Sequence, residues 1–424
     1  MLSPLGSFVK YTNFVQILLD YPKERRRVMN KLKKSELIDR SKLFGTILLC
    51  GLFVVGLIKC TMPYDIVGVI STDGLLVVDA YIVAPTGSSI KLSRSKGLTE
   101  SGDYEKVSNA LVTVVNDRGD IIATAGENGF MTGEYVINDP LSFVAGTKYA
   151  LDIVIGSEHF QSAFEEPLVT PEIDELGWAH RNNGYELDIL LSTHDPLQQA
   201  EYYLWRYDEE WEYTARVFAG YRWDMERREV VPYRPEDNMY YCWDKSPHTS
   251  LIFDNVKSLQ SGILKEKVIV NHKSGGTRFD LLYSIFVKQY AIPYEAYKYY
   301  ENLRNNASET GGLFAPQPTE MDGNIVNLTN PDKSVIGYAL IAIETNKRIY
   351  INGMDVPRMK ADFNDRCMDL PVEVIIYSPA DAYAKGWGIY DYGTTYSYRR
   401  LECVDCRFAG GSKRKPTFWP TDHM

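Results

Sequence analysis

The chain has 424 residues, with 46 Lys and Arg, 56 Asp and Glu and a formal net charge of −10. Residues 1–59 carry 11 Lys and Arg against four Asp and Glu, so the remainder carries 35 against 52, a charge of −17. Nucleic-acid partners demand basic surfaces, so this acidic body argues against them. Its length allows two or three domains, and its 30 Tyr and seven Trp favour strands.

An apolar segment near the start has the layout of a secretory signal. Residues 43–58 contain no charged side chain, and they follow a group of basic residues: Lys31, Lys33, Lys34, Arg40 and Lys42. A positive region, a short apolar region and a processing site are the parts of such a signal, and this segment is shorter than the roughly 20 residues of a spanning helix. Cys60 closes it, so we predict lipoprotein processing with Cys60 as the lipidated first residue. Met29 begins a better signal than Met1, so residues 29–59 are the predicted signal within a leader of residues 1–59.

One residue fits this signal poorly. Lys59 stands where lipoprotein signals usually have a small residue, and its cationic side chain should hinder the peptidase. An uncleaved signal anchor therefore stays open as the alternative.

Residues 60–74 are predicted to be a tether, and residues 75–166 an immunoglobulin-like β-sandwich. Short segments rich in Val, Ile and Tyr alternate there with turn signals, such as those at residues 117–120 and 127–129. The predicted strands are LLVVDAYI, SSIKLSRS, NALVTVVND, DIIATA, GEYVIN, KYALDIVIG and HFQSAF. About seven short strands in such a length are typical of that sandwich.

A larger β-rich domain with one or two short helices is predicted for residues 172–424, after a proline-containing linker. Residues 200–223 are long, aromatic and alternating, and they predict a hairpin with its turn at Asp208, Glu209 and Glu210. The segments VIGYALIAIE and KRIYING predict another hairpin. Two further strands are expected around a turn at residues 273–276, where Ser274-Gly275-Gly276 suits a hairpin.

A helix is predicted from Pro293 to about Asn305, because proline suits the first helical position and Tyr294, Tyr297 and Tyr300 follow helical spacing. Residues 224–238 carry mixed charges and two prolines and predict an exposed loop. The C-terminal tail is expected to be irregular.

Four cysteines remain once Cys50 is lost with the signal and Cys60 is lipidated: Cys242, Cys367, Cys403 and Cys406. An even set in an exported protein predicts two disulfides, with three connectivities open. The Cys403–Cys406 spacing also allows half of a metal site, a redox motif or free thiols. A four-thiolate zinc site wants a second close pair, and a redox motif should open a helix after a strand, so disulfides are favoured.

No recognised catalytic motif occurs in the sequence. The six histidines do not have metal-binding spacing, and there is no nucleophile elbow, phosphate-binding loop or dinucleotide fingerprint. We therefore assign no catalytic, cofactor-binding or metal-binding residue and expect a protein that is not an enzyme. The aromatic residues at 202–213 favour core packing, with a ligand-stacking platform as the alternative.

Several motifs, in order along residues 60–420, resemble one family. They are CTMPYDI from Cys60, the strand LLVVDAYI, the block YSIFVKQYAIPYEAYKYYENLRNN with the following ETGGLFAPQP, and the tail CVDCRFAGGSKRKPTFWP. The chain is similar to the Bacteroidota lipoproteins of domain of unknown function 4249. The resemblance implies an outer-membrane lipoprotein, commonly encoded beside a TonB-dependent transporter, and it implies no catalytic residues.

These observations predict a lipid-anchored outer-membrane protein, on the cell surface rather than the periplasmic face. It would be a non-catalytic accessory or ligand-binding partner of a TonB-dependent nutrient transporter. The alternatives are a structural or adhesive surface lipoprotein and, less favoured, a glycan or peptide hydrolase. The ligand is not indicated. The predicted partner surface comprises residues 224–238 and the loop residues Gly311, Gly312, Phe314, Pro316 and Pro318.

Overall fold

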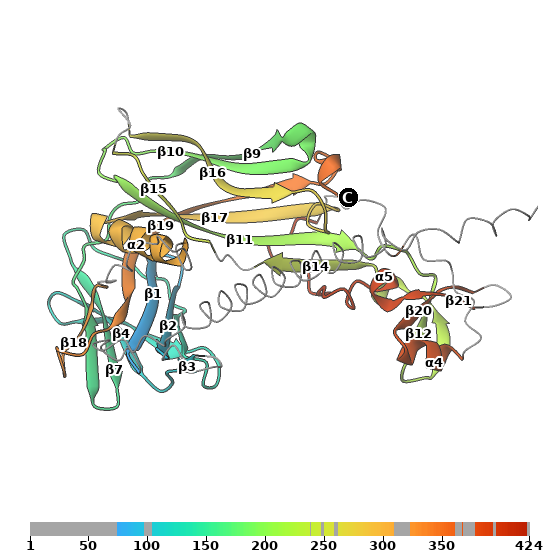
Figure 1. The fold of residues 1–424 in the computed structure, drawn as a ribbon, viewed down its shortest axis with the longest axis horizontal. Coiled ribbons are helices and arrows are strands. Elements are labelled where there is room, and N and C mark those ends of the chain that lie inside the picture. Colours follow the sequence, from blue (N-terminus) through green and yellow to red (C-terminus); the bar gives the residue numbers. More distant parts are fainter. Residues whose placement is uncertain are drawn as a thin grey trace, which may run out of the picture. The chain divides into compact units, whose positions relative to one another are not determined.

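The computed structural model describes residues 74–96, 104–237, 239–246, 250–257, 262–308, 323–360, 367, 378–392 and 396–421. The leader, Cys60, the tether up to residue 73 and the loop at residues 311–318 lie outside them. Within this range the fold is mainly β with a few short helices, which confirms the predicted class (Figure 1). No helix there is long and apolar enough to cross a membrane.

The first part of the fold is a two-layered arrangement of short strands, here called the first sandwich. All seven strands predicted for it are present, and a two-residue strand, β3, is added. They are β1 (Leu76–Ala84), β2 (Ser88–Arg94), β3 (Glu105–Lys106), β4 (Leu111–Asn116), β5 (Ile121–Glu127), β6 (Glu134–Ile137), β7 (Tyr149–Ile155) and β8 (Glu158–Ser162).

The first sandwich is closed around a core of alternate side chains. The strands follow one another in the order β1-β2-β6-β5-β4-β7-β8. Ile82 and Ile90, from β1 and β2, share a core with Val112 and Leu151, from β4 and β7. Because successive side chains of a strand point to opposite faces, Val83 of β1 belongs to a different cluster on the outer face.

Two strands from late in the chain complete this sandwich. β18 (Ile325–Asn327) pairs with β8, and the first half of β19 (Ile336–Asn352) runs parallel to β1. Residues 325–343 therefore fold with strands that precede the boundary predicted between residues 166 and 172, although they follow that boundary in the sequence.

The second sandwich packs a three-stranded sheet, β16-β10-β9, against the strands β14-β11-β17-β19. Its further strands are β9 (Ile173–Arg181), β10 (Glu186–His194), β11 (Tyr202–Thr214), β14 (Tyr241–Ser246), β15 (Ile252–Asn255), β16 (Ile263–Lys273) and β17 (Leu282–Ile292). The aromatic alternation of β11 supplies its core, through Tyr203, Trp205, Tyr207, Trp211 and Tyr213. The helical turns η1 (Asn182–Gly184) and η3 (Pro357–Met359) lie outside the sheets.

The hairpin predicted at Asp208, Glu209 and Glu210 is wrong, because β11 runs straight through these residues. Their backbone pairs with β17, and Glu209 and Glu210 also pair with β14. Three consecutive acidic residues resemble the sequence of a turn. The side chain of the central one, Glu209, instead points into the core and contacts polar side chains there.

The hairpin predicted between VIGYALIAIE and KRIYING is also wrong, because both segments belong to β19. Its first half pairs with β1 and its second half with β17. Polar residues near the middle of β19 contact the start of the second sandwich: Thr345 Oγ1 donates to the carbonyl of Pro171 at 2.8 Å, and Lys347 Nζ donates to that of Asp174, in β9, at 2.7 Å. The turn at residues 273–276 forms no hairpin either, since β16 pairs with β10 and β17 with β11 and β19.

The predicted helix is present as α2 (Tyr294–Ser308), directly after Pro293. Its buried residues Ala296, Tyr299 and Tyr300 pack on outward-facing side chains of β1, β11, β17 and β19. It therefore covers the region where strands of both sandwiches meet.

The remaining elements form a third part, at the right of Figure 1. They are β12 (Tyr221–Asp224), β13 (Glu229–Pro232), η2 (Pro235–Asp237), α4 (Pro379–Ala384), β20 (Trp387–Tyr392), β21 (Tyr396–Arg400) and α5 (Leu401–Val404). We call it the disulfide-bonded lobe.

Candidate functional site in the disulfide-bonded lobe

The disulfide-bonded lobe has a small core of its own. Two hairpins, β12–β13 and β20–β21, lie side by side. Ala382, Ile389 and Tyr398 are buried between them, and Tyr221 and Trp387 pack at the edge. So small a core gives little stability by itself, and covalent links commonly reinforce such units.

Two disulfides provide those links. Cys242 of β14 bonds to Cys406, with a Cα–Cα distance of 5.9 Å, and Cys367 bonds to Cys403, at 5.5 Å. This confirms the prediction of two disulfides and settles the connectivity. Because Cys403 and Cys406 bond to different partners, they form neither a redox pair with each other nor half of a zinc site.

Backbone contacts also join the lobe to the second sandwich. The N–H of Cys406 donates to the carbonyl of Met239 at 3.0 Å. The backbones of Trp243 and Ser412 exchange two hydrogen bonds of 2.8 Å, which form one antiparallel β-bridge between β14 and the tail. The tail is thus anchored where Cys242 and Cys406 are bonded.

An exposed loop was predicted for residues 224–238, but residues 224–237 contain the turn and second strand of the β12–β13 hairpin and the helical turn η2. Asp224 Oδ1 accepts hydrogen bonds of 3.0 Å from the N–H groups of Glu226 and Arg227 and thereby shapes the turn. Arg228 has a φ of 55°, in the left-handed region that such tight turns use.

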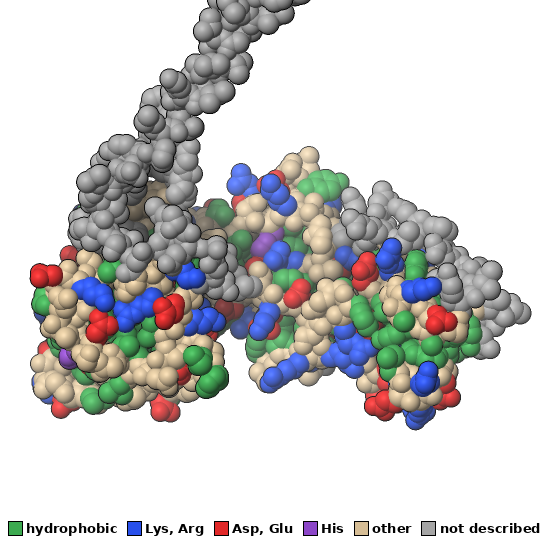
Figure 2. All heavy atoms as spheres, turned by 60° about the horizontal axis from the view of Figure 1, so that its bottom comes forward, with side chains coloured by type: hydrophobic (Ala, Val, Ile, Leu, Met, Phe, Trp, Pro, Cys, Tyr) green, Lys and Arg blue, Asp and Glu red, His purple; other side chains and the backbone are tan. Residues whose placement is uncertain are grey.

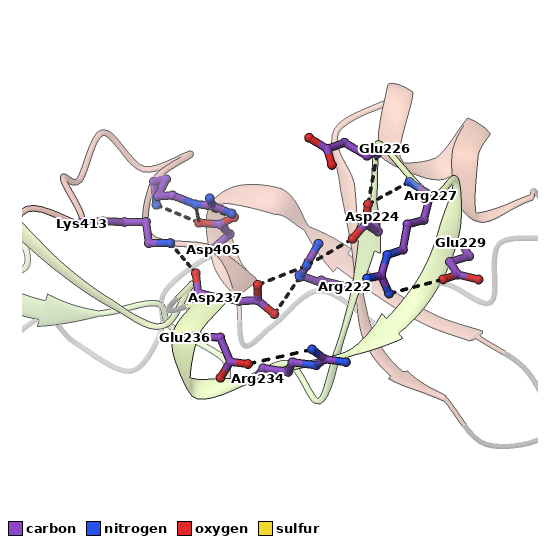
Figure 3. Close-up of polar contacts among 11 residues, drawn as sticks. Arg222, Asp224, Glu226, Arg227, Glu229, Arg234, Glu236, Asp237, Asp405 and Lys413 are labelled. Atoms are coloured by element: carbon purple, nitrogen blue, oxygen red, sulfur yellow. Dashed lines mark hydrogen bonds and ion pairs between the residues drawn. The ribbon is translucent and has the colours of Figure 1, made fainter.

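Arg222 holds this hairpin to the helical turn after it (Figure 3). Its guanidinium lies 3.0 Å from a carboxylate oxygen of Asp237 and 3.3 Å from one of Asp224. The hydrogen bond from Arg222 lowers the pKa of Asp237, and the N–H of Arg227 with the charge of Arg222 lowers the pKa of Asp224. Lys413 Nζ donates to the carbonyl of Asp237 at 2.5 Å, so the tail is fixed to the same turn.

An open pocket of about 620 Å³ lies against this hairpin. Its walls come from the β12–β13 turn, α4, the junction of β21 with α5, and the tail. The side chains that carry its chemistry are Trp223, Met225, Arg228, Tyr383, Arg400, Glu402 and Phe408.

The pocket combines apolar side chains with two cations, Arg228 and Arg400, and one acid, Glu402. Met225 is 64 % exposed and Phe408 is 49 % exposed, so the pocket leaves large apolar surface in water. Arg400 stacks over the ring of Trp387 at 5.2 Å. In the part of the chain that the structure describes, the guanidinium groups of Arg228 and Arg400 have no ion-pair partner.

The space-filling view agrees with this reading (Figure 2). Hydrophobic side chains gather on the right-hand lobe, with basic and acidic side chains around them. Aromatic faces flanked by arginines suit stacking and the binding of anionic or hydroxyl groups. Among the described residues, no group of three His, Cys, Asp or Glu is placed to hold a metal ion.

The sequence pointed to one wall of this pocket and missed the rest. Residues 224–238 were expected at a partner surface, and Met225 and Arg228 of that segment line the pocket. The other predicted residues, Gly311, Gly312, Phe314, Pro316 and Pro318, lie outside the described residues. Tyr383, Arg400 and Phe408 carry no local signal, because only the tertiary fold brings them to the hairpin.

The family model described as "Domain of unknown function (DUF4249)" matches residues 61–348. No curated protein matches the chain. Among solved structures, the chain is similar to a Salmonella alpha-2-macroglobulin mutant and to E. coli alpha-2-macroglobulin, each at 10 % identity and a TM-score of 0.17. These matches cover 54 % and 55 % of the chain and 14 % of each macroglobulin.

Proposed function

Because the chain belongs to the family of domain of unknown function 4249, we propose that it is a lipid-anchored outer-membrane protein that serves a TonB-dependent nutrient transporter. Cys60 carries the lipid in this proposal, and two or three acyl chains suffice for a stable anchor. The protein acts by binding a ligand or the transporter, without catalysis, at the cell surface.

The observation that carries the proposal is the pair of disulfides around the pocket. Structural disulfides form and persist in oxidising compartments outside the cytosol, which agrees with the signal at residues 29–59. Cys242–Cys406 holds the tail to β14 of the second sandwich, and Cys367–Cys403 fixes α5, which follows the pocket residue Arg400. A lobe stabilised in this way keeps an exposed apolar surface in one shape, and large exposed apolar patches mark interaction sites.

The test is purification of the lipidated protein from gently solubilised outer membranes. We expect a large β-barrel transporter to accompany it. The double variant Arg228→Gln/Arg400→Gln should lose this partner, while Arg118→Gln, at an exposed turn of the first sandwich, should keep it. A wild-type protein that runs alone would refute the transporter partnership. A partner equally retained by the double variant would exclude the pocket as its contact.

A further inference from the structure

A second cavity, of about 280 Å³, lies where α2 covers the junction of the two sandwiches. It is separate from the pocket of the disulfide-bonded lobe, and the two share no lining residue. Its chemistry comes from Asp79 and Tyr81 of β1, Arg206 of β11, Tyr299 and Tyr300 of α2, and Tyr338 of β19.

Two opposite charges line this cavity without forming an ion pair with each other. Among the described residues, neither Asp79 nor Arg206 has an ion-pair or hydrogen-bond partner for its side chain. Asp79 is an exposed residue of the cavity's lining, and partial loss of water around its carboxyl raises its pKa, while the positive charges of Arg206 and Lys91 oppose that rise. Lys91 itself is paired with Glu134 at 3.2 Å. The cavity therefore presents one free carboxylate and one free guanidinium.

Arg206 is held in place by an aromatic ring. Its guanidinium carbon lies 4.2 Å from the ring centroid of Tyr81, a cation–π contact. Such a contact orients the guanidinium and leaves its N–H groups available to a carboxylate. Arginine binds a carboxylate through two parallel N–H···O hydrogen bonds.

The other walls are preformed and aromatic. The rings of Tyr299 and Tyr300 are 5.5 Å apart and nearly perpendicular, and that of Tyr338 lies 5.3 Å from Tyr299. Tyr300 and Tyr338 are almost fully buried, so their rings have little freedom to fill the cavity.

We propose that this cavity binds a small zwitterion, a free amino acid or a dipeptide. Its ammonium group lies at Asp79, its carboxylate at Arg206, and its side chain against the tyrosine rings. A volume of about 280 Å³ is at the lower end of small-molecule pockets, which run from about 300 Å³ upward, so the ligand is small. Apolar walls with a few convergent polar groups are the usual composition of such a site.

This inference goes beyond the proposed partnership and does not depend on it. The transporter is tested by co-purification and the zwitterion by binding to the purified protein, so each can fail alone.

The test is calorimetric titration of the full-length, lipidated protein in detergent. The zwitterionic probes are L-leucine, L-phenylalanine and the dipeptide Gly-Leu. Two analogues of leucine each lack one charge: isoamylamine has only the ammonium group and 4-methylpentanoate only the carboxylate. We expect at least one zwitterion to bind and each analogue to bind about tenfold or more weakly, since a hydrogen bond to a charged group contributes about 1.5–3 kcal/mol.

Variants locate the site. Asp79→Asn and Arg206→Gln should each weaken the binding of the zwitterion about tenfold, while Arg118→Gln, at an exposed turn of the first sandwich, should leave its affinity unchanged. Thermal unfolding of each variant verifies that it is folded, and the analogue series needs no variant at all. The proposal is overturned if none of the three zwitterions binds at millimolar concentration. It is equally overturned if the analogues bind as well as leucine, or if Asp79→Asn and Arg206→Gln bind the zwitterion as tightly as the wild-type protein does.

Discussion

The hydroxyl of Tyr283 donates a hydrogen bond of 2.6 Å to the carboxylate of Glu209 between the sheets of the second sandwich. His272 Nε2 lies 2.8 Å from the same oxygen, and Arg278 lies at 3.6 Å. Glu209 and His272 are 4 % and 7 % exposed. The buried carboxylate of Glu209 is thus surrounded by groups that stabilise its negative charge.

Replacing this acid should strongly destabilise the second sandwich. Glu209→Ala leaves Tyr283 and His272 without their acceptor in the core, and breaking a buried charged pair costs about 3–5 kcal/mol. Urea unfolding followed by tryptophan fluorescence measures the loss. Glu236→Ala, at an exposed acid of the lobe, should change the midpoint little. Equal stability of both variants would contradict the role given to Glu209.

The same group should make stability depend on pH. Burial alone raises the pKa of Glu209, but the hydrogen bonds from His272 and Tyr283 and the charge of Arg278 outweigh it, so the pKa is lower than usual. An acid with a lowered folded-state pKa contributes stability above its unfolded pKa of about 4.3, and this is lost as pH falls through the folded value. Wild-type protein should therefore lose more stability than Glu209→Gln between pH 6 and about 3. Parallel melting curves for the two proteins would refute this assignment.

Gly337 should not tolerate a side chain. It has a φ of 125°, and an added Cβ would lie 1.8 Å from the carbonyl oxygen of Val78 on the paired strand β1. Gly337→Ala must therefore separate β1 from β19, and we expect it to lower the free energy of unfolding by on the order of 3 kcal/mol or more. Gly126→Ala is the control, because a Cβ added at Gly126 would have no atom within 4 Å. Thermal unfolding compares them, and similar midpoints would argue against close pairing at Gly337.

The two disulfides should differ in what they stabilise. Cys242–Cys406 joins residues 164 apart and Cys367–Cys403 residues 36 apart. Loop-closure entropy then gives about 5 and about 4 kcal/mol respectively. We expect Cys406→Ser to release the tail from β14 and Cys367→Ser to loosen only the lobe. Hydrogen exchange in β14 and in β20 distinguishes them; equal effects on β14 would contradict the distinction.

Lys59 should limit lipoprotein processing. Replacing it with a small residue, Lys59→Ala, is expected to raise the fraction of protein that begins at lipidated Cys60. Cys60→Ser should abolish lipidation. Mass spectrometry of the mature N-terminus measures both, and an intact bond between Lys59 and Cys60 in the wild-type protein would favour the uncleaved anchor.

Local patterns were sufficient for the seven predicted strands of the first sandwich and for α2. The strands of residues 76–162 alternate regularly and are separated by turn residues, and Pro293 marks the helix start. Such signals act over a few residues, so they can be recognised without knowing the rest of the fold.

The predictions that were wrong concern segments whose conformation depends on contacts with residues distant in the sequence. The segment expected to turn at residues 208–210 is a strand, and its central acid, Glu209, lies 2.8 Å from His272, which is 63 residues away in the chain. The polar middle of β19 is explained by Pro171 and Asp174, more than 170 residues away. Neither the disulfide connectivity nor the pocket residue Phe408 could be predicted from local sequence, since each depends on this long-range arrangement.

The position of β19 affects how the protein must be made. A chain emerges from the ribosome N-terminus first, at about 5–20 residues per second. β1 appears early, but its parallel neighbour, residues 336–343, appears only after most of the second sandwich. Throughout that interval β1 has an unpaired edge, which is the kind of edge that joins other chains. This edge of β1 can be covered within the protein only once β19 has been made.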